Sequence, residues 1–239
     1  MLITDIHAHV VPGVDDGSRS LEESVTMLRM SAAQDVGTVI ATPHSWGIDD
    51  CGYGYMISRY EELNRTVKER EIPVQLYLGC EMLAFAHTVD DCIRKLKDGR
   101  YPTLAGSRFV LTEFDPYETP EDMERCIERI AAAGYMPVIA HAERYHQITT
   151  SDIRALKHLG AKVQINAYSV ANESNLQTRR LANDLLSDRL VDFIGSDAHR
   201  LDHRPPVIGD GVAAMKRLYS EEYAEKILAT DPQSVLPQA

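Results

Sequence analysis

The feature that most constrains this chain is a regular alternation of short strand-like runs with longer segments of helical periodicity. The alternation starts at residues 2–6 and continues to about residue 195 without a linker. Such an alternation is typical of α/β proteins with a largely parallel sheet. We therefore predict a single domain over residues 1–239, with the C-terminal helices of residues 207–239 packed on it.

Seven strand-like runs and the signals of the helices between them can be assigned. The runs are residues 2–6, 38–42, 74–78, 109–112, 137–140, 162–165 and 191–194. A capping-box pattern at Ser20 and Glu23 predicts a helix that ends near Gly37. Thr119 followed by a proline predicts the start of another helix, and Gly134 predicts its end.

Seven strand–helix units fit either a (β/α) barrel one unit short of eight or an open, doubly wound sheet. Histidine, aspartate or glutamate follows nearly every predicted strand. An open sheet binds ligands at one switch point, whereas a barrel brings the C-terminal ends of all its strands around one mouth. Because these side chains follow six strands, we favour the barrel.

Two pairs of candidate metal ligands lie at the first and last strands. His7 and His9 are two apart on a strand, so both imidazoles face the same side and can reach one ion. An isolated pair of this kind is equally well explained by a polar turn. Asp197 and His199 form a second such pair at the last strand, which neighbours the first in a closed barrel.

Further side chains of the same chemistry bring the candidate ligands to five histidines and four carboxylates. The set is His7, His9, Asp16, His44, Glu81, Glu113, His141, Asp197 and His199. Taken alone, Asp16 would be assigned to a turn and Glu81 or Glu113 to a solvated loop. Nine ligands are too many for one ion, so two or three ions are implied.

Nitrogen and oxygen ligands without thiolates suit Mn, Fe or Zn. Clustered divalent ions are suited to phosphate esters, because they generate hydroxide near neutral pH and stabilise in-line displacement. Arg144 and Arg204 lie three and five residues after candidate ligands and could bind phosphate oxygens through their guanidinium groups. The alternative for each arginine is a surface ion pair.

The ordered motifs together resemble a known superfamily. They are Asp5-Ile-His7-Ala-His9, Asp15-Asp16-Gly17, Ala41-Thr-Pro-His44, Gly79-Cys-Glu81, Leu111-Thr-Glu113-Phe, Ile139-Ala-His141-Ala-Glu-Arg144-Tyr, Gly195-Ser-Asp197-Ala-His199 and Arg204-Pro-Pro. This set resembles the polymerase-and-histidinol-phosphatase (PHP) superfamily. Within it, the chain is similar to the bacterial manganese-dependent protein tyrosine phosphatases of capsule and exopolysaccharide synthesis, the CpsB/YwqE type.

The resemblance implies a distorted (β/α)7 barrel with three divalent ions, most often manganese. One ion would be held by His7, His9, Glu81 and Asp197; a second by Glu81, Glu113 and His141; the third by Asp16, His44 and His199. Arg144 and Arg204 would bind the phosphate. The implied substrate is a phosphotyrosine protein, typically the tyrosine-rich tail of a kinase that governs polysaccharide synthesis. The resemblance does not fix the oligomeric state, because it is compatible with a monomer and with a homo-oligomer.

Charge and composition exclude several other classes. The net charge is -11 with scattered lysines and arginines, which argues against a nucleic-acid or anionic-membrane surface. The N-terminus lacks a signal-peptide pattern, and no apolar run approaches the ~18 residues of a membrane span. The four cysteines, Cys51, Cys80, Cys92 and Cys126, form no CxxC pair and are expected to be thiols. We therefore expect a cytoplasmic protein without membrane insertion.

Four functional hypotheses follow. We predict a metal-dependent tyrosine phosphatase in which a metal-bound hydroxide attacks phosphorus in line. The nearest alternative is a small-molecule phosphatase such as histidinol-phosphatase. A metal-dependent nuclease is disfavoured because tracking a nucleic-acid backbone needs a basic groove. A non-catalytic metal-binding scaffold is disfavoured by the complete ligand set.

Overall fold

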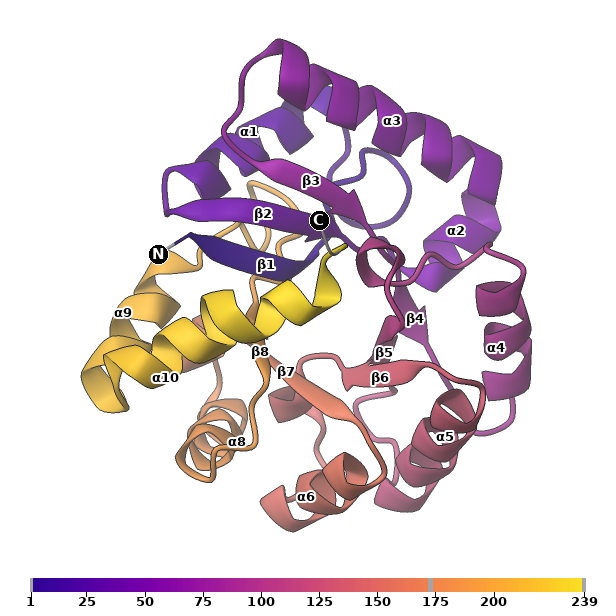
Figure 1. The fold of residues 1–239 in the computed structure, drawn as a ribbon, viewed down its shortest axis with the longest axis vertical. Coiled ribbons are helices and arrows are strands. Elements are labelled where there is room, and N and C mark those ends of the chain that lie inside the picture. The colour runs from indigo at the N-terminus through magenta and orange to yellow at the C-terminus, as the bar shows by residue number, and fades with distance from the viewer. Residues whose placement is uncertain (1, 172–173, 238–239) are drawn as a thin grey trace.

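The computed structural model describes residues 2–171 and 174–237, and Figure 1 shows their arrangement. Eight strands are found within this part of the chain. They are β1 (Ile3–Ala8), β2 (Val36–Ala41), β3 (Gln75–Leu78), β4 (Glu81–Leu83), β5 (Phe109–Glu113), β6 (Met136–Ile139), β7 (Lys162–Asn166) and β8 (Phe193–Gly195). Every strand pair within the sheets is parallel, which confirms the predicted α/β class.

Helices connect most of the strands and cover their outer faces (Figure 1). They are α1 (Leu21–Ala32), α2 (Ser45–Cys51), α3 (Tyr53–Glu69), α4 (Val89–Lys97), α5 (Pro120–Ala132), α6 (Thr150–His158), α7 (Ala167–Val170), α8 (Leu176–Ser187), α9 (Gly209–Leu218) and α10 (Glu221–Glu225). Short turns of other helix types are η1 (Leu104–Gly106), η2 (Ala142–Arg144), η3 (Lys226–Thr230) and η4 (Asp231–Val235). The predicted boundaries of α5 are confirmed: Thr119 caps its start, and Gly134 follows its end with a φ of +92°.

The strands form two sheets that meet at both edges. Their orders are β1-β2-β3 and β4-β5-β6-β7-β8. At one seam, a parallel bridge joins Ala8 to Ala198, and the His9 N–H donates to the Ala198 carbonyl at 2.7 Å. At the other seam, His44 is bridged to Glu81. These bridges join the two sheets at both edges, as in the distorted barrel that the sequence favoured and unlike an open sheet.

One local prediction was wrong. The first helix ends at Ala32, and Gly37 lies inside β2; the chain turns earlier, at Asp35, which has a φ of +64°. Glu81 follows the third strand as predicted, but it also begins a separate short strand, β4, three residues beyond Leu78, which the sequence pattern did not indicate. No helix separates β3 from β4 in the described chain, so the eight strands correspond to the seven predicted units.

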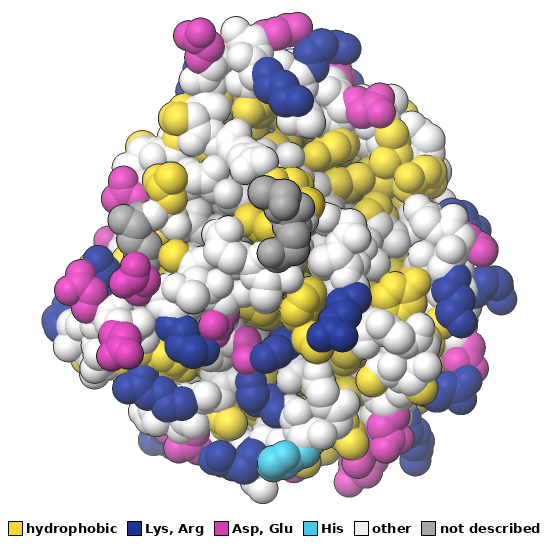
Figure 2. Space-filling view, in the orientation of Figure 1, with side chains coloured by type: hydrophobic (Ala, Val, Ile, Leu, Met, Phe, Trp, Pro, Cys, Tyr) yellow, Lys and Arg dark blue, Asp and Glu magenta, His cyan; other side chains and the backbone are white. Residues whose placement is uncertain are grey.

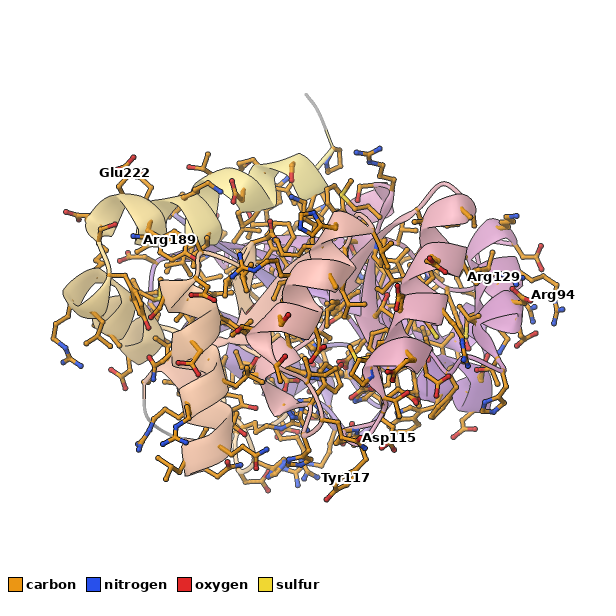
Figure 3. The ribbon with its side chains drawn as sticks, turned by 90° about the horizontal axis from the view of Figure 1, so that it is seen from below. Arg94, Asp115, Tyr117, Arg129, Arg189 and Glu222 are labelled. Atoms are coloured by element: carbon orange, nitrogen blue, oxygen red, sulfur yellow. The ribbon has the colours of Figure 1, made fainter. Side chains whose placement is uncertain are left out.

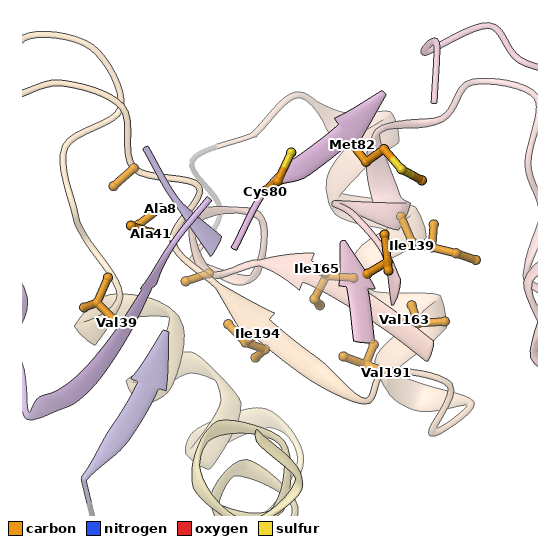
Figure 4. Packing of buried hydrophobic residues seen from close by; sticks show 14 of the residues in the cluster. Ala8, Val39, Ala41, Cys80, Met82, Ile139, Val163, Ile165, Val191 and Ile194 are labelled. Atoms are coloured by element: carbon orange, nitrogen blue, oxygen red, sulfur yellow. The ribbon is translucent and has the colours of Figure 1, made fainter. Parts of the chain in front are cut away.

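Hydrophobic side chains pack both inside the barrel and between the barrel and its helices. The interior cluster includes Ile6, Leu111 and Phe193, and it is covered at one end by Val235 of the C-terminal segment. Residues of the outer layer are shown in Figure 4, among them Val39, Ile139, Val163 and Val191.

The two ends of the barrel differ. Figure 3 shows the C-terminal helices at one end and, at the opposite end, the loop after β5 with Asp115 and Tyr117. The C-terminal ends of the strands therefore open on the side away from the C-terminal helices, where active sites of (β/α) barrels lie.

The outer surface carries charges of both signs. On the face shown in Figure 2, basic and acidic side chains are intermixed around the rim. In the described part of the chain, none of the helices has the length and apolar character needed to cross a membrane.

Candidate metal centre

A polar cavity of about 260 Å³ lies at the C-terminal ends of the strands. Its lining residues are Asp16, His44, Trp46, Glu81, Glu113, His141, Arg144, Asp197, His199 and Arg204. His7 and His9 lie beside it, fully buried and in contact with Glu81. The structure thus brings the nine predicted ligands and both predicted arginines into one cluster.

Glu81 is at the centre of this cluster. Its Oε2 lies 3.2 Å from His7 Nε2, 3.1 Å from His9 Nε2 and 3.1 Å from His44 Nδ1. This buried oxygen nevertheless has no hydrogen-bond partner among the described residues. Burial opposes its charge, but the neighbouring imidazoles hold the pKa of Glu81 well below its usual range. A buried carboxylate oxygen that faces several nitrogens without hydrogen bonds has the geometry expected of a metal ligand.

Ligand atoms lie close enough to share an ion in three groups. These are His9, Asp16, His44 and His199; His7, His9 and Asp197; and His44, Glu81 and Glu113, with the atoms of each group within 4.8 Å of one another. The groups differ in part from the sets implied by the resemblance, because His9 and His44 each occur twice. His141 Nε2 lies beside them, 2.8 Å from Glu81 Oε1 and 3.5 Å from Glu113 Oε1.

Hydrogen bonds behind the histidines set the orientation of their rings. Nδ1 of His9 donates to Asp15 at 2.7 Å, and Nδ1 of His199 donates to the carbonyl of Asp197 at 2.9 Å. Nδ1 of His7 donates to the side-chain oxygen of Gln164 at 3.2 Å. In all three residues Nε2 faces the cluster, which is the arrangement usual for metal-binding histidines.

Sequence reasoning missed two residues of β7 that connect the predicted ligands. Gln164 Oε1 also accepts the backbone N–H of His141 at 2.8 Å, and its amide donates to Asn166 at 2.8 Å. Asn166 in turn donates to Asp197 Oδ2 at 3.0 Å. Both side chains are fully buried. Their signal in the sequence is the i, i+2 spacing of two amides that alternate with the apolar residues Val163 and Ile165.

Three residues of the cluster have a left-handed backbone, which is uncommon for residues other than glycine. The φ values are +33° for His141, +52° for Asp197 and +54° for Arg204. Such conformations cost about 1–3 kcal/mol each and concentrate at functional sites. At Asp197 this conformation is supported by a hydrogen bond that its N–H donates to the His7 carbonyl at 2.8 Å.

Both arginines approach the same carboxylate oxygen. Arg204 Nη1 lies 2.6 Å from Asp197 Oδ2, and Arg144 Nη1 lies 3.3 Å from it. Arg204 Nη2 also donates to His199 Nε2 at 2.7 Å. The two guanidinium groups therefore line the cavity next to the predicted ligands, where they can bind an anion.

The donor set fits divalent cations. Five imidazoles and four carboxylates converge without a thiolate, and the nitrogens His44 Nδ1 and His141 Nδ1 are buried without hydrogen-bond partners among the described residues. Unpaired buried polar atoms are costly unless an ion or water binds them. Imidazole and carboxylate ligands together suit Mn, Fe or Zn.

Comparison with known proteins gives consistent matches over nearly the whole chain. A family model described as capsular polysaccharide synthesis, CpsB/CapC, matches residues 3–237. The chain is 30% identical to the tyrosine-protein phosphatase CpsB of Streptococcus pneumoniae and 28% identical to that of Streptococcus agalactiae serotype III, over 97% of each chain in both cases. Crystal structures of YwqE from Bacillus subtilis and CpsB from Streptococcus pneumoniae, described as unique metal-dependent tyrosine phosphatases, include a chain that superposes with a TM-score of 0.84. That match has 27% identity and covers 93% of this chain and 90% of the other.

Proposed function

This chain belongs to the CpsB/CapC family of capsular polysaccharide synthesis proteins, and from that premise we propose that it is a metal-dependent protein-tyrosine phosphatase. The observation that carries the proposal is the convergence of five histidines and four carboxylates on one cavity that two arginines also line. Clustered metal ligands next to guanidinium groups are suited to phosphoryl transfer from an ester to water.

The metal ligands in this proposal are the nine predicted residues, and the ions are divalent, manganese first among them. They are His7, His9, Asp16, His44, Glu81, Glu113, His141, Asp197 and His199. Divalent ions bound there would lower the pKa of water and offset the charge of the phosphate oxygens. The unpaired Oε2 of Glu81, close to three imidazole nitrogens, supports a bridging position for this carboxylate.

In this proposal Arg144 and Arg204 bind the phosphate oxygens. Burial alone would lower the pKa of Arg144, but the charges of Asp197 and of neighbouring acidic groups together outweigh it and raise this pKa, so the guanidinium group stays cationic. A phenol leaving group has a pKa of about 10 and needs less protonation than an alcohol. The site is therefore suited to a tyrosyl ester even without a dedicated general acid.

The proposed substrate is a phosphotyrosine protein, specifically the tyrosine-rich tail of a kinase of polysaccharide synthesis. The cavity of about 260 Å³ is smaller than pockets that enclose a drug-sized ligand, about 300–1,000 Å³, and is suited to the end group of a larger substrate. We place the protein in the cytoplasm, where its four free cysteines would remain thiols. A homo-oligomer is compatible with this proposal.

The test is phosphate release by protein that has been stripped with a chelator and reloaded with manganese. A phosphotyrosine peptide and histidinol phosphate are compared in the same experiment, and we expect manganese-dependent release mainly from the peptide. Release mainly from histidinol phosphate would overturn the protein-substrate assignment and retain the metal site. His141→Ala and Asp197→Ala should abolish turnover with an unchanged circular dichroism spectrum, whereas His158→Ala, at an exposed histidine outside the cluster, should remain active.

A further inference from the structure

Trp46 is an unexpected residue in the wall of the polar cavity. Of the ten described residues that line it, Trp46 alone is hydrophobic. Its side chain is 40% exposed, although it follows the buried residues His44 and Ser45. A large aromatic side chain at the edge of a polar cavity leaves apolar surface in water that an apolar ligand group can cover.

The position of Trp46 is fixed from several sides. Its indole stacks on the imidazole of His44, with ring centroids 5.2 Å apart and an angle of 24° between the planes. On one side of Trp46 in the sequence, Ser45 Oγ accepts the backbone N–H of Leu83 at 3.1 Å. On the other side, a Cβ on Gly47 would lie 2.7 Å from the carbonyl oxygen of Val14, so glycine is needed for α2 to pack against that loop. The backbone on both sides of Trp46 is therefore constrained, and the His44 ring supports the indole before any substrate binds.

We propose that Trp46 is a specificity-determining residue that packs against the aromatic ring of the substrate while Arg144 and Arg204 bind its phosphate. The inference rests on the proposed function, since it assumes that the cavity binds a phosphate ester. It assigns the substrate class as aryl phosphates in preference to alkyl phosphates. An alkyl phosphate can make the same contacts with the two arginines but leaves the indole exposed.

The expected size of the effect follows from ring packing. An aromatic pair contributes about 0.5–1.5 kcal/mol beyond the area it buries, which corresponds to roughly 2- to 13-fold in binding. The effect should be confined to ligands that carry a ring. Binding of inorganic phosphate, which has no ring, should change little when the indole is removed.

The experiment compares three inhibitors of the manganese-loaded protein: phenylphosphonate, methylphosphonate and inorganic phosphate. For the unaltered protein we expect tighter inhibition by phenylphosphonate than by methylphosphonate. Trp46→Ala should reduce this preference roughly 3- to 10-fold, and Trp46→Phe should retain most of it. Because the ratio is taken within each variant, any change in metal occupancy affects both inhibitors alike. An unchanged ratio in Trp46→Ala would overturn the inference.

A matched control and an independent readout are available. Tyr117 is also exposed and stacks on a histidine, with its ring centroid 4.8 Å from that of His146, but it does not line the cavity. Tyr117→Ala should leave the inhibitor ratio unchanged, and an equal loss in this variant would contradict a specific role of Trp46. Trp46 is the only tryptophan of the chain, so its fluorescence should respond to phenylphosphonate and not to methylphosphonate.

The fluorescence titration also separates this inference from the proposed function. If the unaltered protein releases no phosphate from a phosphotyrosine peptide, the proposed function fails, whatever the fluorescence shows. If it is active but its fluorescence responds equally to both phosphonates, the role of Trp46 fails alone.

Discussion

The carboxylate of Asp15 accepts a hydrogen bond from Nδ1 of His9 at 2.7 Å, and the same oxygen accepts the backbone N–H of His44 at 2.9 Å. Its other oxygen accepts the N–H of Gly17 at 3.0 Å. Burial opposes the charge of this carboxylate, but the charge of His9 and the hydrogen bonds from His9 and His44 together outweigh it and lower the pKa of Asp15 to about 2. Asp15 therefore orients two predicted ligands without being one itself.

Replacing Asp15 should weaken metal binding without unfolding the protein. Asp15→Asn has a similar size but only one acceptor oxygen, so it cannot keep all three hydrogen bonds. Loss of such a partner typically lowers metal affinity about 10- to 100-fold. Isothermal titration with manganese measures the change, with Asp50→Asn as the exposed control on α2. Unchanged affinity in Asp15→Asn would refute this role.

Gln164→Leu should also lower metal affinity, because it removes the acceptor for His7 and the connection through Asn166 to Asp197. We expect a loss of at least about tenfold. The bound manganese per chain can be counted by mass spectrometry after dialysis against a weak chelator. Gln75→Leu makes the same change at an exposed position of β3 and should bind metal normally. Full metal content in Gln164→Leu would show that β7 has only a packing role.

Arg144→Ala should lower kcat/KM by roughly 100- to 1000-fold, as expected when one preorganised donor to the transition state is lost. Metal content should stay intact, because Arg144 contributes no metal-binding atom. Arg154→Ala removes an exposed arginine on α6 and should have no such effect. If Arg144→Ala instead loses its metal, its proposed role in phosphate binding is wrong.

Metal loading should release protons at neutral pH. Burial and the charge of Arg144 disfavour a protonated His141, but hydrogen bonds with Glu113 and Glu81 outweigh them and raise its pKa to about 9. A metal ligand must lose this proton, so manganese affinity should rise with pH up to about 9. Titration calorimetry in two buffers of different ionisation enthalpy counts the protons. His141→Gln should release fewer than the unaltered protein, and equal release would contradict the assignment.

The predicted ligands at the strand ends could be identified from the sequence because they follow strands that apolar residues mark clearly. The spacing of His7 and His9 places both rings on one side of β1 whatever the rest of the fold does. The α/β class and the arrangement of the strands around one mouth followed from the same pattern. Glu81 was assigned to the correct edge of the sheet, although the short strand that it begins was not foreseen.

The residues that were missed depend on contacts between distant segments. Gln164 touches His7 only because β7 and β8 bring position 164 next to β1, 157 residues earlier in the chain. Asp15 directly precedes Asp16 in a turn, and one of its oxygens stabilises that turn; its contact with His9 cannot be inferred from a turn signal. Trp46 lies on a helix of seven residues, which is too short to show a helical periodicity.

The contact between β1 and β8 has a consequence for the synthesis of the chain on the ribosome. His7 and His9 are synthesised about 190 residues before Asp197 and His199. Until then, β1 has no partner along this edge, and a nascent chain carries only part of the ligand cluster. The ribosome must therefore translate beyond β8 before the cluster can assemble. A product truncated before β8 would be inactive.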